Sequence, residues 1–251
     1  MDSSKLFNPK IINIYGNIGV GKSTFINELF KELMKYHENI CKVDEPINIW
    51  KSVIDHTTGK NILQTFYDDI KRWGYTFESL TYITRVKVLL RAISEANKII
   101  LTDQSPETGI NIFSKMLFDD GLISELEYEC QKEWRDFYQT ELYEKYQRKI
   151  IYLHCTPKTA FHRIHDIRHR EEEKNVSIDY VRRVHEYHEE WLLDMDKENI
   201  LDKLSKGEKA ITFKNKNGID ILVLDYDKDF DIDSITSQQY MQYVLEFIKQ
   251  D

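Results

Sequence analysis

The chain has 251 residues, a hydrophobic content of 41% and a formal net charge of -8. This length can bury the core of one large domain, and no linker interrupts the sequence, so we expect a single domain over 1–251. The acidic balance argues against a nucleic-acid polymer or a membrane surface as partner, because neither anion is attracted to an acidic protein. No apolar run is long enough for a membrane span, and three cysteines without a CxxC pair fit a reducing, cytoplasmic compartment.

An apolar run over 11–15 leads into the glycine-rich segment GNIGVGKST, and a helical pattern follows from Phe25. Glycines let successive backbone N–H groups turn towards one anion, and the start of a helix adds the positive end of its dipole. The lysine adds a positive charge and the serine hydroxyl can hold Mg²⁺, so the spacing predicts a site for a nucleoside triphosphate. The residues expected there are Gly16, Asn17, Ile18, Gly19, Val20, Gly21, Lys22, Ser23 and Thr24.

The next predicted elements are a helix over 22–35, whose apolar face includes Met34, and a strand over 40–44. Glu45 follows this strand and precedes Pro46. Proline disfavours a helical residue before it, so Glu45 is expected to be extended at the carboxyl end of the strand. Ligands bind at that edge of open α/β sheets, although an ordinary loop carboxylate is the alternative.

Aromatic residues are frequent in the helical pattern over 48–73, and such a stripe is more often core than ligand site. A long helix is predicted over 76–98, with Glu78 and Arg85 seven residues apart on one face. Taken alone, two charged residues in this arrangement predict that this face of the helix is exposed to solvent. The apolar positions expected on this helix are Leu80, Ile83, Val86, Leu90 and Ile93.

The continuous apolar run over 99–103 has the form of a buried parallel strand, and it ends in Asp103, a carboxylate suited to Mg²⁺. A loop is expected over 104–109, followed by helices over 110–118 and 124–146. The second helix is rich in Glu and Tyr and could be the pairing surface of a homodimer. Its candidate buried positions are Leu126, Trp134, Phe137 and Leu142.

Two further strands, over 150–153 and 221–224, complete an expected set of five. A strand and turn are inserted over 205–219, and a closing helix is expected over 235–249. Strands that alternate with helices predict an α/β fold with a parallel sheet, flanked by helices and joined by right-handed crossovers.

An arginine-rich stretch follows the helix that begins at Thr156 and Pro157, a cap and proline in the preferred order. Planar guanidinium groups suit phosphate oxygens, and several on one mobile segment over 163–176 could close over a triphosphate as a lid. A solvated helix with salt bridges is the alternative. The lid arginines are Arg163, Arg168 and Arg170.

Histidines are concentrated in the same part of the chain, where six of the eight lie between His154 and His188. His162, His165 and His169 have helical spacing. No cysteine or carboxylate completes a recognisable ligand pattern with them, so we disfavour a metal site there.

Blocks of sequence in a fixed order resemble the deoxynucleoside kinases of the deoxycytidine, deoxyguanosine and mitochondrial-type thymidine kinase group. They are GNIGVGKST at 16–24, EPINIW at 45–50, RWGYTFE at 72–78, and the stretch from Arg163 through HEYHEEWL at 185–192. The resemblance covers nearly the full length. It implies a P-loop kinase fold with an arginine-rich lid, a deoxynucleoside acceptor, ATP or another NTP as donor, and Mg²⁺.

The resemblance also implies roles in the reaction. Glu45 matches the carboxylate that takes the proton from the substrate 5′-hydroxyl, which fits a general base. Asp103 matches the acid associated with Mg²⁺, alongside Ser23 of the phosphate loop. Arg163, Arg168 and Arg170 match lid arginines, although the spacing between the first two is one residue longer than in the family pattern.

Further matches concern the two ligands. Tyr67 and Glu173 match the pair that binds the sugar 3′-hydroxyl, and Asp229 with Phe230 resembles the loop at the donor base. The positions that match the lining of the nucleoside pocket are Ile18, Ile47, Trp50, Leu63, Phe66, Phe77 and Phe113.

The chain departs from the family pattern in the acceptor half. Glu78 replaces a glutamine that reads the base; an ionised glutamate only accepts hydrogen bonds, which favours guanine, whereas a protonated one, its pKa raised by burial, would imitate glutamine. Gln104 replaces an arginine near the 5′-oxygen. Gly109 replaces an acid that pairs with the equivalent of Arg85, which leaves this guanidinium unpaired beside the base.

The leading hypothesis from the sequence is a Mg²⁺-dependent deoxynucleoside kinase of nucleotide salvage, because in-line phosphoryl transfer needs this set of positioning and charged groups. The altered region around Gln104 and Gly109 could accept a phosphate, so a deoxynucleoside monophosphate kinase is the second hypothesis. The third is a catalytically weak, nucleotide-binding regulatory protein.

Overall fold

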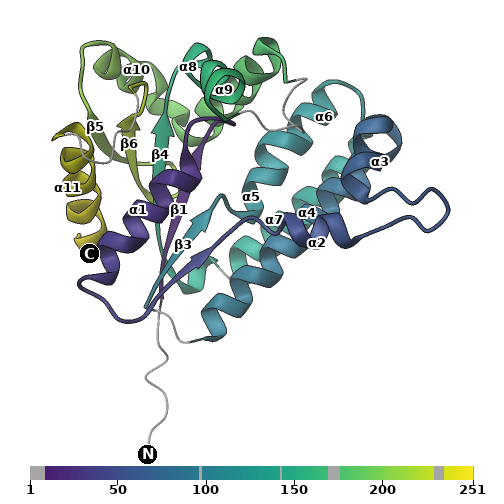
Figure 1. Cartoon of the computed structure of the whole chain (residues 1–251), viewed down its shortest axis with the longest axis horizontal. Coiled ribbons are helices and arrows are strands. Elements are labelled where there is room, and N and C mark those ends of the chain that lie inside the picture. Colours follow the sequence, from purple (N-terminus) through teal and green to yellow (C-terminus); the bar gives the residue numbers. More distant parts are fainter. Residues whose placement is uncertain (1–8, 96–97, 142, 169–175, 229–234, 251) are drawn as a thin grey trace, which may run out of the picture.

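A six-stranded β-sheet forms the centre of the molecule (Figure 1). The fold is given by a computed structural model, which describes residues 9–95, 98–141, 143–168, 176–228 and 235–250. The strand order is β2-β3-β1-β4-β6-β5, and all neighbours are parallel except β5 and β6. The strands are β1 (Lys10–Gly16), β2 (Ile40–Val43), β3 (Ile99–Asp103), β4 (Gln147–His154), β5 (Ala210–Lys214) and β6 (Asp220–Asp225).

The sheet corrects the prediction of five parallel strands. The inserted segment over 205–219 contributes β5, which pairs antiparallel with β6 from Ala210↔Leu224 to Lys214↔Asp220. A tight turn joins the two strands, in which Gly218 has a φ of 73°, a conformation that favours glycine. The outer edge of β6 carries backbone groups that need partners, and the returning chain supplies them.

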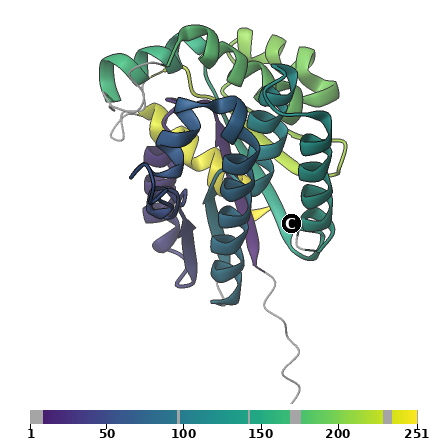
Figure 2. The same cartoon turned by 90° about the vertical axis from the view of Figure 1, so that its right-hand side faces the viewer.

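Helices lie on both sides of the sheet (Figure 2). Two π-helical turns, Gly109–Ser114 and Arg163–Arg168, follow α5 and α8, and 3₁₀ turns lie at Tyr143–Lys145 and Asp194–Asp196. The α-helices are α1 (Lys22–Met34), α2 (Ile47–Ser52), α3 (Ile62–Asp68), α4 (Ile70–Ser94), α5 (Pro106–Thr108), α6 (Lys115–Asp119), α7 (Glu125–Glu141), α8 (Pro157–His162), α9 (Ile178–Leu192), α10 (Lys197–Ser205) and α11 (Ile235–Lys249).

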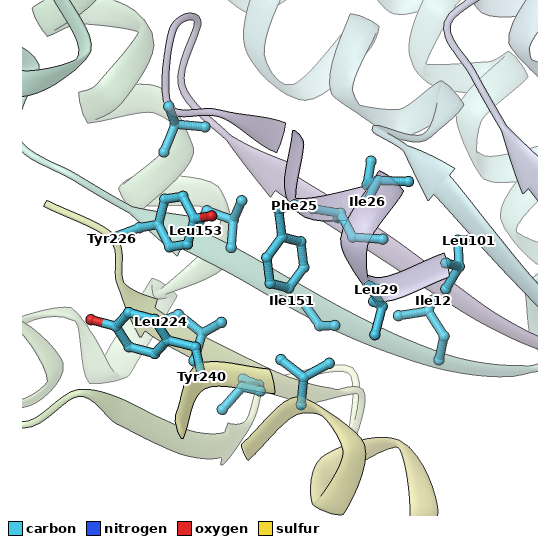
Figure 3. Packing of buried hydrophobic residues seen from close by; sticks show 14 of the residues in the cluster. Ile12, Phe25, Ile26, Leu29, Leu101, Ile151, Leu153, Leu224, Tyr226 and Tyr240 are labelled. Atoms are coloured by element: carbon cyan, nitrogen blue, oxygen red, sulfur yellow. The ribbon is translucent and has the colours of Figure 1, made fainter. Parts of the chain in front are cut away.

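The alternating side chains of β1 supply both halves of the core. Ile12 packs with Phe25 of α1 and Tyr240 of α11 on one face of the sheet (Figure 3). On the other face, Ile11 lies in a cluster with residues of α4 and α7, and Tyr15 lies in a cluster with residues of α9 and α10. Successive side chains of a strand point to opposite faces, so β1 is buried on both, as parallel strands usually are.

The helical pattern over 48–73 is interrupted, which corrects the sequence prediction. Asn61 caps α3 by accepting a hydrogen bond from the backbone N–H of Gln64 (3.0 Å), and Asp69 caps α4 by accepting one from Arg72 (3.0 Å). These side chains satisfy N–H groups that the helix start leaves unpaired. The long helix therefore begins at Ile70 rather than at position 76.

Several apolar positions that were expected to be buried are exposed. Their exposed fractions are 58% for Met34, 54% for Ile83, 46% for Leu90, 79% for Leu126, 42% for Trp134 and 71% for Phe137. Leu142 lies outside the described residues. The buried face of α7 carries Tyr128, Gln131 and Tyr138 instead. Apolar and aromatic residues occur on both sides of this helix, so periodicity alone selected the wrong face.

The loop predicted over 104–109 is partly helical. Ser105 caps α5 by accepting a hydrogen bond from the backbone N–H of Glu107 (3.2 Å), and Pro106 occupies the first helical position. The π-helical turn continues directly into α6. The predicted helix over 124–146 ends at Glu141, followed by the 3₁₀ turn.

A buried ion pair ties α5 to β4. Arg148 Nη2 lies 2.6 Å from Glu107 Oε2, and the side chains are 5% and 8% exposed. Glu107→Gln leaves the guanidinium charge buried without its carboxylate, so we expect the free energy of unfolding to fall by about 3 kcal/mol in urea titrations. The control is Glu95→Gln in the exposed Arg91–Glu95 pair, which should change it by less than about 0.5 kcal/mol. Equal effects of the two substitutions would contradict the assignment.

Candidate active site

The segment over 16–24 forms a phosphate loop between β1 and α1. Gly19 and Gly21 have φ values of 80° and 105°, which favour glycine. A Cβ atom on Gly19 would lie only 2.5 Å from the carbonyl oxygen of Ala160, so the close approach of α8 also needs glycine. The helix α1 starts at Lys22 with its free N–H groups towards the loop, which is the geometry of an anion site.

Two side chains of the loop make further contacts. Lys22 Nζ donates hydrogen bonds to the carbonyl oxygens of Gly16 (2.9 Å) and Asn17 (3.0 Å), so the ammonium lies across the loop. Asn17 is 2% exposed, and its Nδ2 donates to the carbonyl oxygen of Val181 in α9 (2.9 Å). Its Oδ1 accepts from the backbone N–H of Ile18 (2.8 Å). The loop is therefore anchored to α9 from the inside.

Oxygen atoms suited to Mg²⁺ meet beside the loop. Ser23 Oγ donates a hydrogen bond to Asp103 Oδ2 (3.1 Å), which joins the start of α1 to the end of β3. Burial raises the pKa of Asp103, the Lys22 charge opposes this, and the Glu45 charge adds to it. Hydroxyl and carboxylate oxygens are the ligands that Mg²⁺ takes in proteins, so this pair fits the ion.

Glu45 lies after β2 at the same edge of the sheet. It accepts a hydrogen bond from Arg85 Nη2 of α4, and it is 31% exposed whereas Arg85 is 7% exposed. A small cleft at this edge is lined by Glu45, Arg85, Asp103 and Gln104, among others. The carboxylate is thus held by a guanidinium and is still reachable by a ligand.

The pair Glu78 and Arg85 is buried, so the expectation of a solvated face is wrong. The exposed fractions are 6% and 7%. The helix α4 packs with α3, α5 and the π-helical turn Gly109–Ser114, which cover this face. Burial of a helix face depends on these distant segments, which the helix sequence does not contain.

Burial raises the pKa of Glu78 to about 7, against the opposing charge of Arg85. Thr81 Oγ1 lies 3.3 Å from Glu78 Oε2. A Cβ atom on Gly109 would lie 3.4 Å from Glu78 Oε2 and 3.6 Å from Arg85 Nη1, so the glycine borders both groups. Among the described residues, Nε and Nη1 of Arg85 are buried without a hydrogen-bond partner. These donors are therefore available to an acceptor on a ligand.

An aromatic cluster stands beside these charges. Phe66 and Phe77 are stacked with ring centroids 4.6 Å apart, and Trp50 meets Phe77 edge-on at 5.8 Å. Ile47 and Leu63 pack against this cluster, while Ile18 and Phe113 pack in a neighbouring one. Five of the predicted pocket residues therefore lie together, Ile47, Trp50, Leu63, Phe66 and Phe77. Tyr67 is 66% exposed at the side of this cluster, in ring contact with Phe66 (5.2 Å).

Gln104 has an unusual backbone. Its φ is 64°, which is uncommon for a residue other than glycine, and its N–H donates to the carbonyl oxygen of Ile14 (3.1 Å). Within the described part of the chain, its buried Oε1 has no hydrogen-bond partner. Strain and an unpaired polar atom at the carboxyl end of β3 are features of ligand sites.

The predicted lid is described only at its start. Arg163 is 9% exposed; its Nη1 donates to the carbonyl oxygens of Val20 (3.1 Å) and Tyr226 (2.9 Å), and its Nη2 to that of Lys228 (2.7 Å). It thus joins the phosphate loop to the segment after β6. The side chain of Arg168 and the residues Arg170, Glu173, Asp229 and Phe230 lie outside the described residues, so their roles stay predictions.

Two threonines of α4 have roles that the sequence interpretation missed. Thr84 Oγ1 accepts a hydrogen bond from Trp50 Nε1 (2.8 Å), which fixes the indole of the aromatic cluster. Thr81, one turn after Glu78, donates a hydrogen bond from Oγ1 to Glu78 Oε2 (3.3 Å). Thr81 lies three residues after Glu78 and four before Arg85, so it shares their helix face, and this spacing was the available signal for it. The position of Thr84, next to Arg85 in the sequence, gave no such signal.

The fold and this edge of the sheet define a P-loop phosphotransferase, in which a phosphate loop, a candidate base and an aromatic cluster converge. The chain belongs to the deoxynucleoside kinase family, whose model matches residues 12–249.

Individual relatives agree with this family. The mitochondrial deoxyguanosine kinase of Xenopus laevis is 28% identical over 99% of this chain and 93% of its own length. Human deoxycytidine kinase is 29% identical over 88% of this chain and 85% of its own. A probable deoxycytidine kinase of Fowlpox virus (strain NVSL) is 31% identical over 96% and 89%. Among the described helices, none combines the length and the apolar character that a membrane span requires.

The protonation of Glu78 can be measured through stability. Its folded pKa of about 7 exceeds the ordinary 4.5, so between these values the folded state holds a proton that the unfolded state has lost. Stability from this group is therefore present at low pH and lost as the pH rises through about 7. Relative to Glu78→Gln, we expect the wild-type free energy of unfolding to fall with a slope of up to about 1.4 kcal/mol per pH unit in that window.

The exposed Glu38 provides the control, because Glu38→Gln should leave the shape of the pH dependence unchanged. Parallel curves for the wild type and Glu78→Gln would show that Glu78 titrates normally. The result also decides which hydrogen bonds Glu78 offers to a base: a protonated carboxyl has one donor and one acceptor, whereas a carboxylate has acceptors only.

Proposed function

We propose that this chain transfers the γ-phosphoryl group of ATP or another NTP to the 5′-hydroxyl of a deoxynucleoside. The observation that carries the proposal is the convergence of Lys22, Ser23, Asp103 and Glu45 at one sheet edge, beside the aromatic cluster. There, the phosphate donor can bind on one side of the Glu45 carboxylate, and the nucleobase of the acceptor can bind on the other side.

Each described residue has a distinct task in this reaction. The phosphate loop and Lys22 hold the donor phosphates, and Ser23 with Asp103 would hold Mg²⁺, which neutralises charge on the phosphates when bound. Glu45 takes the proton from the attacking hydroxyl, while Arg85 orients its carboxylate. The aromatic rings bind the base between flat apolar surfaces. Arg168 and Arg170 would add positive charge from the lid.

The test is an incubation of the full chain with labelled ATP and Mg²⁺, with four deoxynucleosides and, separately, with their monophosphates. We expect transfer to at least one deoxynucleoside. Transfer only to monophosphates would replace the proposal by a monophosphate kinase, and ATP binding without transfer would support a regulatory protein.

Glu45→Gln should lower kcat by about 10²-fold or more, because a neutral amide cannot accept the hydroxyl proton. Binding of ATP should be nearly unchanged, since Glu45 lies on the acceptor side. Asp44→Asn is the matched control: this neighbouring carboxylate is 68% exposed and pairs with Lys42, so kcat should be retained. Unchanged kcat in Glu45→Gln would remove this residue from the role of base.

We also propose that two chains pair through the exposed apolar residues of α4 and α7. These helices are adjacent, with the rings of Tyr82 and Trp134 6.4 Å apart, and exposed apolar residues gathered on neighbouring helices are typical of an interface. A twofold dimer uses the same patch on both chains. The patch comprises Ile83, Leu90, Leu126, Trp134 and Phe137.

Sedimentation should give about twice the chain mass of 30.1 kDa for the wild type. Phe137→Glu should give the single chain mass, because a charge in an apolar interface is costly. Met34→Glu, at an exposed apolar position of α1, should leave the dimer intact. A monomeric wild type would refute the pairing. The cytoplasmic location stays a prediction of the sequence.

A further inference from the structure

Two histidines and a glutamate converge outside the phosphate-transfer site. His154 ends β4, whereas His185 and Glu189 lie one turn apart on α9. Glu189 Oε1 is 3.1 Å from His154 Nε2 and 2.8 Å from His185 Nε2. The three ligand atoms lie within 4.8 Å of one another, and no other group of three such ligands occurs in the described part of the chain.

The fold fixes this arrangement from two directions. Residues four apart on a helix share a face, which places His185 beside Glu189. On β4, His154 shares its face with Tyr152, which packs in one cluster with Leu192 of α9. The side chains of His154, His185 and Glu189 are only 13%, 12% and 8% exposed. The donors therefore meet in a nearly enclosed space rather than on a flexible surface.

We propose that His154, His185 and Glu189 form a site for one transition-metal ion of the zinc type, which fixes α9 to the end of β4. Two imidazoles and a carboxylate are a frequent ligand set for Zn²⁺ and for similar divalent ions, with one position left for water. The two nitrogen ligands distinguish this site chemically from Ser23 and Asp103, whose oxygen atoms suit Mg²⁺.

The charges around the cluster are compatible with a cation. Glu189 Oε1 faces the Nε2 atoms of His154 (3.1 Å) and His185 (2.8 Å), so an ion bound there would replace these two contacts by bonds to all three side chains. Lys197 Nζ lies 3.1 Å from the other oxygen, Oε2, which leaves Oε1 to the ion. Each histidine would present the Nε2 lone pair and keep its proton on Nδ1.

The histidines singled out by helical spacing do not form a comparable site. His162 pairs with Asp166 (2.6 Å) on the surface, where both side chains are mostly exposed. His165 Nε2 contacts the carbonyl oxygen of Val176 (2.9 Å). His169 lies outside the described residues. The converging ligands come from a strand and a helix far apart in the sequence, which local spacing does not reveal.

The test is a titration of the chelator-treated, nucleotide-free full chain with Co²⁺ and Zn²⁺ in excess Mg²⁺. Co²⁺ bound to histidine absorbs visible light much more strongly than the hydrated ion, so the spectrum reports the ligands. We expect one equivalent per chain. At a Zn²⁺ concentration about a hundred times the dissociation constant, the melting temperature should rise by roughly 5–10 °C.

His154→Gln removes a ligand while the amide still donates to Glu189, so the fold is retained; the affinity for Co²⁺ should fall by at least about 10-fold. His162→Gln is the matched control and should bind as the wild type does. Three results would overturn the proposal: no Co²⁺ bound by the wild type in excess Mg²⁺, an unchanged affinity in His154→Gln, or an equal loss in His162→Gln. None of these results bears on phosphoryl transfer, so failure here is distinguishable from failure of the proposed reaction.

Discussion

The reaction site depends on one constraint, the meeting of three parallel strand ends at a single edge of the sheet. The strands β2, β3 and β1 are neighbours, and their register pairs Val43 with Thr102 and Asp103 with Ile14. The candidate base, the candidate Mg²⁺ ligand and the phosphate loop therefore leave the sheet side by side. Ladder hydrogen bonds and close core packing hold the strands, so this edge resists displacement. The backbone thus positions the chemistry before any ligand binds.

In the acceptor half of the site, the arrangement of the charged side chains depends on the buried guanidinium of Arg85. A buried guanidinium loses its hydration and needs partners, and Glu45 supplies one while Glu78 lies close enough to interact. Gly109 adds no side chain, so two buried donor atoms of Arg85 stay available among the described residues. Burial raises the pKa of Glu78 to about 7; the Arg85 charge opposes this shift, and the Glu45 carboxylate adds to it. Arg85 therefore interacts with both carboxylates, Glu45, the candidate general base, and Glu78, the residue expected to face the nucleobase.

Local patterns predicted the elements at this edge of the sheet well. The phosphate loop, the strand before Glu45 and the strand that ends at Asp103 each depend on short stretches of sequence, and the structure places all three as expected. The aromatic cluster followed from the resemblance to the kinase family. These features could be predicted because each depends on the conformation of a short segment or on a motif that matches the family, with little contribution from residues far away in the sequence.

Nonlocal packing explains the predictions that failed. The strand β5 joins the sheet only because β6 has an open edge, and the burial of Glu78 depends on α3 and α5 covering α4. The face of α7 that packs inward cannot be chosen from a helix with aromatic residues on both sides. Caps at Asn61 and Asp69 were readable in principle, since both residue types favour helix starts. They were missed because the aromatic pattern continued across them.

The helix α9 contacts both the phosphate loop and the end of β4. Its first turn carries Val181, whose carbonyl oxygen holds Asn17 of the phosphate loop, and its last turns carry His185 and Glu189 against β4. The contacts of His185 and Glu189 lie one and two turns from Val181 on the same helix. Fixing α9 at His154 thus supports the loop geometry without touching a phosphate.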